Sequence, residues 1–188
     1  MIIRKEQQEH AMDLFDLEND FKPLIKMTDT YCFGCSPSNE AGLKMRFHAG
    51  KDSVISRLNV PQHLCGWRHI VHGGIVSAIL DETMSWSTIY LLKRVVLTTS
   101  ITVDFIKPVF AAKAITSQGK VLERISEREA IMEGTIFDSE GEVCAKSRGT
   151  FRLFTPEAAR KYSLMSPDIL DDFENFIRTH ENHSTGPY

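Results

Sequence analysis

The longest apolar run of the chain lies between Ile75 and Leu92, where Asp81 and Glu82 are the only charged residues. A segment of this length that is apolar on nearly all sides predicts a buried helix, because a surface helix keeps one polar face. Carboxylates are rarely buried without a partner or a task. The pattern therefore predicts a central helix whose two adjacent acids need a chemical explanation.

Shorter apolar and alternating runs predict that the rest of the central region folds as strands. The predicted strands lie at 43–48, 53–60, 96–107, 112–124, 129–138 and 142–154. A turn at 49–52 joins the first two, and a loop at 61–71 leads into the helix. Short links and one long helix predict an antiparallel sheet wrapped around a central helix, an α+β fold. One curved sheet cannot cover such a helix on all sides, so we expect a second subunit to complete the cover.

Helical segments are predicted on both sides of this region. Residues 6–27 carry apolar residues among charges and predict a helix that ends near Pro23. Thr155 and Ser166 are each an N-cap type of residue followed by proline, which predicts two further helix starts. The second of these helices has its apolar residues on one face, so it should dock on the domain. We therefore divide the chain into a helical extension at 1–30, a domain at 31–154 and a helical tail at 155–188.

The helical periodicity separates the two acids. At about 100° per residue, Asp81 shares a narrow polar stripe with Ser77, Ser85 and Thr88. Glu82 falls on the other side, among Ile75, Ile79, Trp86 and Ile89. Asp81 therefore has room for a ligand beside it, whereas Glu82 has bulky neighbours. The alternative, that both acids face solvent or meet basic partners elsewhere, stays open.

Two glycines, Gly73 and Gly74, stand at the front of the helix directly after His72. Glycine lets another molecule approach the backbone closely. The first N–H groups of a helix lack partners, and the helix dipole favours negative charge beside them. An acid within three turns of such N–H groups is typical of a site that handles a carbonyl.

The segment from His72 to Glu82 closely resembles the helix signature of hotdog-fold acyl-CoA thioesterases of the PaaI-like group. That signature is a His-Gly-Gly triplet followed by an acid nine positions after the histidine, which here is Asp81. The strand from Val96 to Pro108 resembles the next strand of that family. Upstream, the lead-in Cys32-Phe33-Gly34-Cys35, with Asn39 and Gly42-Leu43, is similar to that of the same branch. The resemblance covers residues 31–154.

The resemblance implies the hotdog fold and an enzyme that hydrolyses an acyl-CoA thioester to free acid and CoA. It implies that the Gly73 N–H stabilises the oxyanion and that Asp81 acts as general base on water or as nucleophile. It also implies that His72 orients the thioester and that Thr98 helps to position the water. For His72 the alternative is a helix-start histidine bonded to a neighbouring carbonyl, and for Thr98 an ordinary strand threonine. Hotdog domains dimerise, so the resemblance further implies a homodimer or a dimer of dimers with interfacial active sites.

Coenzyme A carries phosphate groups, so basic side chains are expected at the mouth of a pocket that binds it. Lys107, Arg124 and Arg128 are candidates because they lie at predicted strand ends or turns. Ordinary surface exposure is the alternative for all three. Gly74, Glu82 and Ser85 are expected to line the substrate-binding pocket.

Composition excludes some classes of partner. A net charge of −3 and a pI of about 6.2 argue against a nucleic-acid-binding protein, which would carry a basic stripe. No apolar stretch has the length and flanks of a membrane span, and the first residues lack the apolar core of a signal peptide. We therefore expect a cytoplasmic protein with no nucleic-acid or membrane partner.

The four cysteines lie at positions 32, 35, 65 and 144. A chain of this size without a secretion signal does not need disulfides. No second Cys-x-x-Cys pair follows, although His63 and Cys65 could complete a four-ligand zinc set with Cys32 and Cys35. We expect instead that the thiols are structural, in a tight turn around Gly34, and that the protein holds no metal and no cofactor.

Two other functions compete with thioester hydrolysis. A non-catalytic acyl-CoA-binding hotdog domain would not need an acid at position 81. A hotdog dehydratase or hydratase would use an Asp/His pair in a different helix context from His72 and Asp81. Release of free CoA from a panel of acyl-CoA substrates distinguishes the three.

Overall fold

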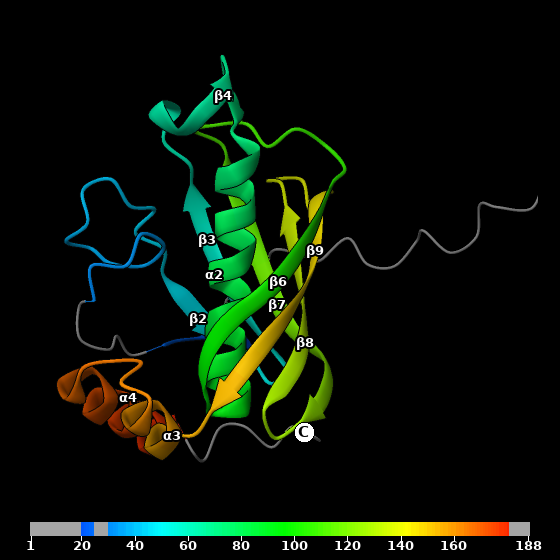
Figure 1. Cartoon of the computed structure of the whole chain (residues 1–188). Coiled ribbons are helices and arrows are strands. Elements are labelled where there is room, and N and C mark those ends of the chain that lie inside the picture. Colours follow the sequence, from blue (N-terminus) through cyan, green and yellow to red (C-terminus); the bar gives the residue numbers. More distant parts are fainter. Residues whose placement is uncertain (1–19, 25–29, 181–188) are drawn as a thin grey trace, which may run out of the picture.

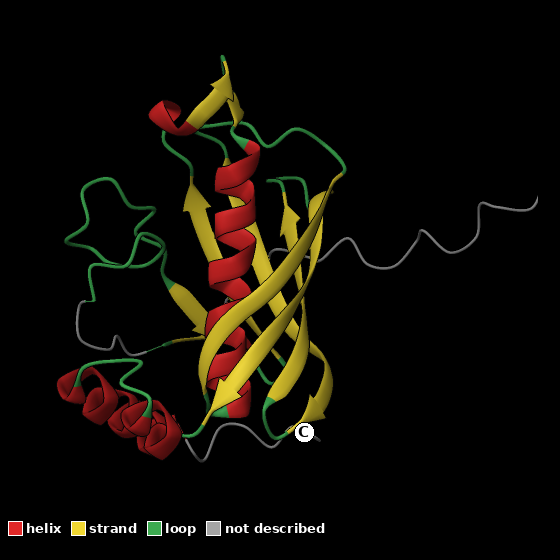
Figure 2. Cartoon of the chain, viewed as in Figure 1, coloured by secondary structure: helices red, strands yellow, loops and turns green. Residues whose placement is uncertain are grey.

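The computed structural model of the chain describes residues 20–24 and 30–180, and its central element is a seven-stranded sheet around one long helix (Figures 1 and 2). The sheet order is β1-β2-β3-β7-β8-β9-β6, and every pair of neighbours is antiparallel. The strands are β1 (Lys22–Pro23), β2 (Phe47–Ala49), β3 (Ser53–Asn59), β6 (Val95–Phe105), β7 (Ala114–Ser126), β8 (Glu129–Phe137) and β9 (Val143–Phe154). The helix, α2 (Gly73–Leu92), runs along this curved sheet. The predicted α+β hotdog fold is confirmed.

Helix α2 has defined ends. At its start the His72 side chain accepts a hydrogen bond from the Gly74 N–H, which caps the first turn. At its end Lys93 adopts a left-handed conformation with φ 54°, and its N–H donates to the Ile89 carbonyl. The predicted helix is thus confirmed, with two more residues at its N-terminus than the apolar run alone indicates.

The cover of α2 comes from its own chain. None of the residues from Ile75 to Leu92 is exposed. On the side away from the sheet centre, Trp86 stacks on Phe47 with 5.1 Å between ring centroids and meets the edge of Phe176 at 6.0 Å. Much of the cover that the sequence analysis expects from a second subunit therefore comes from the chain itself, and the second subunit stays a prediction. Exposed apolar side chains lie on β6 and just after it, at Leu97, Phe105 and Ile106, and also elsewhere, among them Trp67, Leu122 and Ile125.

Close contact between α2 and the sheet depends on Gly119 in β7. A Cβ atom at this position would lie 2.3 Å from Ser87 Oγ and 2.9 Å from the Thr83 carbonyl oxygen. The second atom belongs to the helix backbone, which cannot swing away as a side chain can. Glycine is therefore the residue that lets helix and strand approach this closely.

We expect Gly119→Ala to lower the free energy of unfolding by about 2–3 kcal/mol, because the added methyl group overpacks the contact between α2 and β7. Urea denaturation of the variant and of the unmodified protein measures the difference. Lys120→Ala is the matched control, since its side chain is exposed on the same strand, and it should change stability by less than about 0.5 kcal/mol. Equal stability of all three proteins would contradict this account of the packing.

The four long strands after α2 lie where the sequence predicts them, within three residues at each end. The predicted strand at 43–48 is wrong in its first half. Leu43 N–H donates to the Phe33 carbonyl at 2.8 Å and Met45 N–H to the Gly34 carbonyl at 2.9 Å. Because these backbone groups bind the Cys32–Cys35 turn, the regular strand begins only at Phe47. The turn consequently starts after Ala49, which is paired in β2.

The segment at 61–71, predicted as a loop, contains short regular elements. A 3₁₀ helix, η1 (Gln62–Leu64), is followed by a small hairpin of β4 (Cys65–Trp67) and β5 (Ile70–Val71). Val71 N–H donates to the Val109 carbonyl at 2.9 Å. The hairpin lies at the end of the molecule where α2 begins (Figure 1).

The two ends of the described chain form short elements beside the sheet. Most of the helix predicted at 6–27 lies outside the described residues. Lys22–Pro23, predicted as the last turn of that helix, form strand β1 instead. The C-terminal helices α3 (Pro156–Lys161) and α4 (Pro167–His180) are confirmed, with Thr155 Oγ1 accepting from the Ala158 N–H. Helix α4 docks through the buried residues Leu170, Phe173 and Phe176. No helix of the described part is both long and apolar enough to cross a membrane.

Candidate active site

A pocket of about 700 Å³ lies at the N-terminus of α2, lined by His72, Gly73, Phe105 and Lys107 among others. The His72 ring is exposed, and its Nδ1 accepts from the Gly74 N–H at 2.9 Å. That bond assigns the ring proton of a neutral imidazole to Nε2, which is left as a donor. His72 is thus a helix cap, in place of the carbonyl-bonded histidine that the sequence left open.

The Gly73 N–H is the backbone donor that the sequence assigns to the oxyanion. Within the described residues no acceptor lies against it. The Gly74 N–H donates to the His72 ring, and the next two N–H groups donate to the His72 carbonyl, so those acceptors are used by its neighbours. The positive end of the helix dipole strengthens a hydrogen bond from this position to an anion. Gly73 therefore offers an available donor at the pocket wall.

Asp81 lies on the face of α2 that looks toward β6. Thr98 Oγ1 donates to Asp81 Oδ1 at 2.7 Å, so the structure joins two residues that the sequence singled out. Asp81 is partly buried and Thr98 is exposed. The pairing of β6 with β9 shifts register between Thr98 and Ser100. Such a bulge re-aims side chains, and no sequence signal indicated it.

Gly73 and Asp81 do not meet within one chain. They are eight residues apart on the same helix, which at 1.5 Å per residue is about 12 Å along its axis. A single carbonyl group cannot contact both. The two groups that the sequence predicts to be catalytic therefore belong to different parts of the surface of one chain.

Glu82 lies in a second pocket, of about 320 Å³, on the other side of α2. Ser85, Trp86, Met45 and Phe173 also line it, so Ser85 and Glu82 share this pocket and Asp81 does not. Trp86 Nε1–H donates to Glu82 Oε1 at 3.1 Å. Burial raises the pKa of Glu82 to about 7. The opposite placement of the two acids follows the helical periodicity, but the prediction that Ser85 shares the stripe of Asp81 is wrong, because Ser85 lines the Glu82 pocket.

The Cys32–Cys35 turn reaches the same pocket and contacts Glu82. One ligand atom from each of Cys32, Cys35 and Glu82 lies within 4.8 Å of the others. A hydrogen bond from Cys35 lowers the pKa of Cys32 to about 5, and the same bond raises the pKa of Cys35. His63 and Cys65, the ligands suggested by spacing, are not in this cluster. Sequence reasoning did not predict that Glu82 contacts the two cysteines, because Glu82 is 47 residues beyond Cys35 and no local pattern links them.

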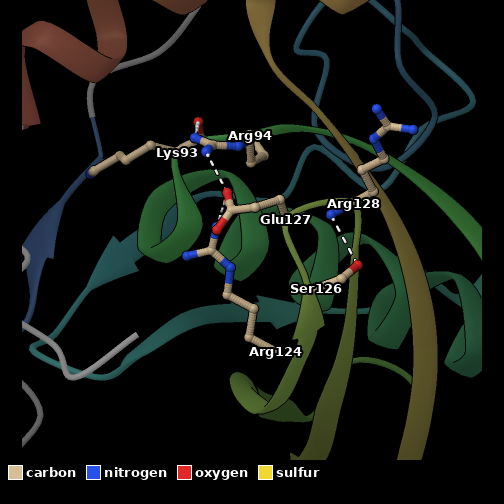
Figure 3. Close-up of polar contacts among 6 residues, drawn as sticks. All are labelled: Lys93, Arg94, Arg124, Ser126, Glu127 and Arg128. Carbon is tan, nitrogen blue, oxygen red and sulfur yellow. Dashed lines mark hydrogen bonds and ion pairs between the residues drawn. The ribbon is translucent and has the colours of Figure 1, made fainter.

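The three basic candidates are not brought together. Lys107 lines the pocket at the start of α2, where its Nζ forms an ion pair with Glu142 at 2.8 Å. Arg124 and Arg128 lie around the β7–β8 hairpin, near the other end of α2 (Figures 1 and 3). Because a helix of 20 residues is about 30 Å long, these two arginines are far from Gly73 of their own chain.

Arg124 already has a carboxylate partner. Glu127 Oε2 binds Arg124 at 2.6 Å and Arg94, just beyond α2, at 3.3 Å, whereas Arg128 uses its backbone N–H to bond Ser126 (Figure 3). These arginines were predicted to lie at the pocket mouth because they are at strand ends. The sequence alone does not indicate at which end of the sheet each strand end lies.

Comparison with protein-family models finds a match to the central segment. Residues 69–145, which contain α2, β6, β7 and β8, match the family model of the thioesterase superfamily. The resemblance seen from His72 to Glu82 is confirmed. No curated protein matches the chain in a sequence search.

Solved structures of hotdog thioesterases share this fold. A protein described as a thioesterase superfamily protein is 20% identical over 65% of this chain and 60% of its own, with a TM-score of 0.61. The PaaI protein of E. coli, from the phenylacetic acid degradation operon, is 16% identical over 60% of this chain and 80% of its own, with a TM-score of 0.54. A hypothetical thioesterase of Streptococcus pneumoniae, solved with coenzyme A, is 17% identical over 55% and 82%, with a TM-score of 0.52. At these identities the likeness concerns the hotdog fold.

Proposed function

We propose that the protein hydrolyses acyl-CoA thioesters, with Asp81 as the group that activates water or attacks the carbonyl. The observation that carries the proposal is the hydrogen bond from Thr98 to Asp81, which orients a partly buried carboxylate. The thioesterase superfamily match and the coenzyme A in the streptococcal structure support the substrate class.

The chemistry needs three groups. Asp81 takes a proton from water while the water oxygen attacks the thioester carbon, or its carboxylate attacks that carbon directly to give a mixed anhydride that water then hydrolyses. The carbonyl oxygen becomes an oxyanion, which the Gly73 N–H stabilises. The carbon–sulfur bond then breaks, and CoA leaves as a thiolate that takes up a proton. His72 directly precedes Gly73 in the chain, and its Nε2–H serves to orient the thioester.

The separation of about 12 Å between Gly73 and Asp81 supports an active site built from two chains. Strand β6 is an 11-residue edge strand, and in the described part of the chain only β9 pairs with it. A long exposed edge is a template for pairing with another strand. A second copy of the same chain would offer the same edge, as in a two-fold dimer.

Antiparallel pairing of two β6 strands brings the catalytic groups together. If the two antiparallel strands pair symmetrically about Ser100, Thr98 of one strand lies opposite the C-terminal half of the other strand, which ends at Phe105. In each chain a Cβ on Gly73 would lie 3.4 Å from the Phe105 ring, so that strand end lies beside Gly73. Asp81 and Thr98 of one protomer would thus face Gly73 of the partner subunit. We therefore propose a homodimer with two interfacial sites, which can pair further into a dimer of dimers.

Lys107 lines the same pocket as Gly73, which supports the proposal that it leaves its ion pair with Glu142 to meet a phosphate of CoA. Arg124 and Arg128 would reach a bound CoA only from another protomer. Free CoA released from a panel of acyl-CoA substrates, followed with a thiol-trapping reagent and corrected for the protein's own cysteines, tests the proposed hydrolysis. Tight acyl-CoA binding without CoA release would favour the non-catalytic binding domain instead.

We expect Thr98→Val to lower kcat by about ten- to a hundredfold, because it removes one hydrogen bond to a charged group. Thr98→Ser keeps the hydroxyl and should restore most of the activity. Steady-state kinetics of the three proteins on one acyl-CoA provide the measurement. Similar kcat values for the Val and Ser variants would show that the hydroxyl does not act on Asp81.

A further inference from the structure

The cluster of Cys32, Cys35 and Glu82 is separate from Asp81, Thr98 and Gly73, and nothing in the proposed hydrolysis uses it. The Cys32 thiol donates hydrogen bonds to Glu82, with Sγ 3.6 Å from each carboxylate oxygen. In a tetrahedral zinc site with a Zn–S bond of about 2.3 Å and a Zn–O bond of about 2.1 Å, the sulfur and oxygen ligands are about 3.6 Å apart. The spacing of these atoms is therefore that of two ligands on one small cation.

The backbone of the turn is shaped to admit the carboxylate. A Cβ at Gly34 would lie 2.4 Å from Glu82 Cδ, so any other residue here would push Glu82 out of the cluster. The Gly34 N–H donates to Cys32 Sγ at 3.3 Å, a bond that favours the thiolate needed by a metal. Backbone bonds from Leu43 and Met45 hold the turn in place.

Glu82 is also held from the helix side. The Trp86 indole N–H donates to Glu82 Oε1 at 3.1 Å, and the indole itself is fixed by its stack on Phe47. Carboxylates that bind metals are commonly oriented by a hydrogen bond of this kind. No lysine or arginine of the described residues forms an ion pair with Glu82. Arg46 lines the same pocket but forms no ion pair with Glu82, so three groups that ionise to anions lie together without a bound cation partner among the described residues.

We propose that Cys32, Cys35 and Glu82 bind a divalent transition metal, with Zn²⁺ as the ion the donor set favours. Two thiolates select zinc over magnesium or calcium, which prefer oxygen ligands alone. Three protein ligands leave a fourth tetrahedral position. All three residues line the pocket of about 320 Å³, so that position would be open to a water or a ligand in the pocket. The metal ties the turn at 32–35 to the middle of α2.

This proposal replaces the sequence-based expectation of structural thiols without metal. That expectation was drawn from spacing, which suggested only His63 and Cys65 as further ligands. The third ligand comes instead from a helix distant in sequence. Folding brings Glu82 to the turn that carries the other two ligands, Cys32 and Cys35.

Metal analysis of the full-length protein tests the proposal directly. Protein purified under reducing conditions, supplied with zinc and dialysed, should retain about one zinc ion per chain. Cys35→Ser and Glu82→Gln should each reduce that content strongly. Cys65→Ser is the matched control, since it removes a free thiol outside the cluster and should retain the zinc.

Cobalt gives a second readout that does not depend on catalysis. Co²⁺ added to the metal-free, reduced protein should produce thiolate-to-metal charge-transfer absorption and the visible bands of a tetrahedral site. The double variant Cys32→Ser with Cys35→Ser should lose both; if it does not fold, Glu82→Gln and the unmodified protein carry the test. An unmodified protein with four reduced thiols that keeps no zinc and shows no cobalt spectrum would overturn the proposal and leave a hydrogen-bonded thiol–carboxylate cluster. Thioesterase activity enters neither measurement, so each proposal can fail alone.

Discussion

Replacing Asp81 with asparagine is expected to lower kcat/KM for an acyl-CoA substrate by about a hundredfold or more, in line with the loss of a general base. Asparagine keeps the size of the side chain and can still accept the Thr98 hydrogen bond. It can neither take a proton from water nor attack a carbonyl as a carboxylate. The fold should be unchanged, so thermal unfolding and circular dichroism should match the unmodified protein.

Two comparison variants make this prediction specific to Asp81. Asp52→Asn makes the same chemical change in an exposed turn between β2 and β3 and should leave kinetics unchanged. Glu82→Gln, on the opposite side of α2, should have a milder effect on hydrolysis than Asp81→Asn. If Glu82→Gln abolishes activity and Asp81→Asn leaves it near the original value, the assignment of Asp81 as the catalytic acid is wrong.

The long elements were predictable because each is specified by its own residues. Helix α2 has an apolar run bounded by a histidine cap and a left-handed lysine, and β6 to β9 have alternating patterns with turns between them. The separation of Asp81 from Glu82 followed from helix geometry alone. These features depend on neighbours a few residues away in the chain.

What the sequence could not predict depends on contacts between distant residues. The start of β2 moves to Phe47 because the residues before it bond to the cysteine turn. The approach of Glu82 to Cys32 spans 50 residues, and Gly34 is the residue that permits it. Arg124 was taken as a pocket residue from its place at a strand end, although the hairpin turns it away from Gly73. Pairing partners decide such positions, and they are not encoded in local periodicity.

The same distinction between local patterns and contacts of distant residues applies to the proposed dimer. An apolar helix was the reason to expect a second subunit, but the helix is covered within one chain by the sheet, Phe47 and α4. Among the exposed apolar side chains, Leu97 and Phe105 lie on β6, whose free edge is open to a further strand, whereas Trp67, Leu122 and Ile125 lie elsewhere. A partner is therefore expected from strand pairing and from the proposed active site, which one chain leaves incomplete, and not from core packing.

Leu97→Arg is therefore expected to convert a dimer into a monomer of 21.3 kDa and to lower activity by about a hundredfold or more. Leu97 lies on the free edge strand with 46% of its surface exposed. Pairing of two β6 strands would bury it, and an arginine there would place an uncompensated charge in the interface. Because Asp81 and Gly73 would then no longer face each other across the interface, activity should fall together with assembly. Analytical ultracentrifugation and kinetics on the same samples measure both.

Leu122→Arg is the matched control for Leu97→Arg. Leu122 is 47% exposed, nearly the same as Leu97, but it lies on β7, which the sheet order separates from the free edge by β8 and β9. This variant should keep the dimer and most of the activity, even if it weakens a dimer of dimers. A Leu97→Arg protein that remains an active dimer would exclude pairing through β6. An active monomer of the unmodified protein would exclude the shared active site altogether, because the 12 Å between Gly73 and Asp81 within one chain is about four times the length of a hydrogen bond.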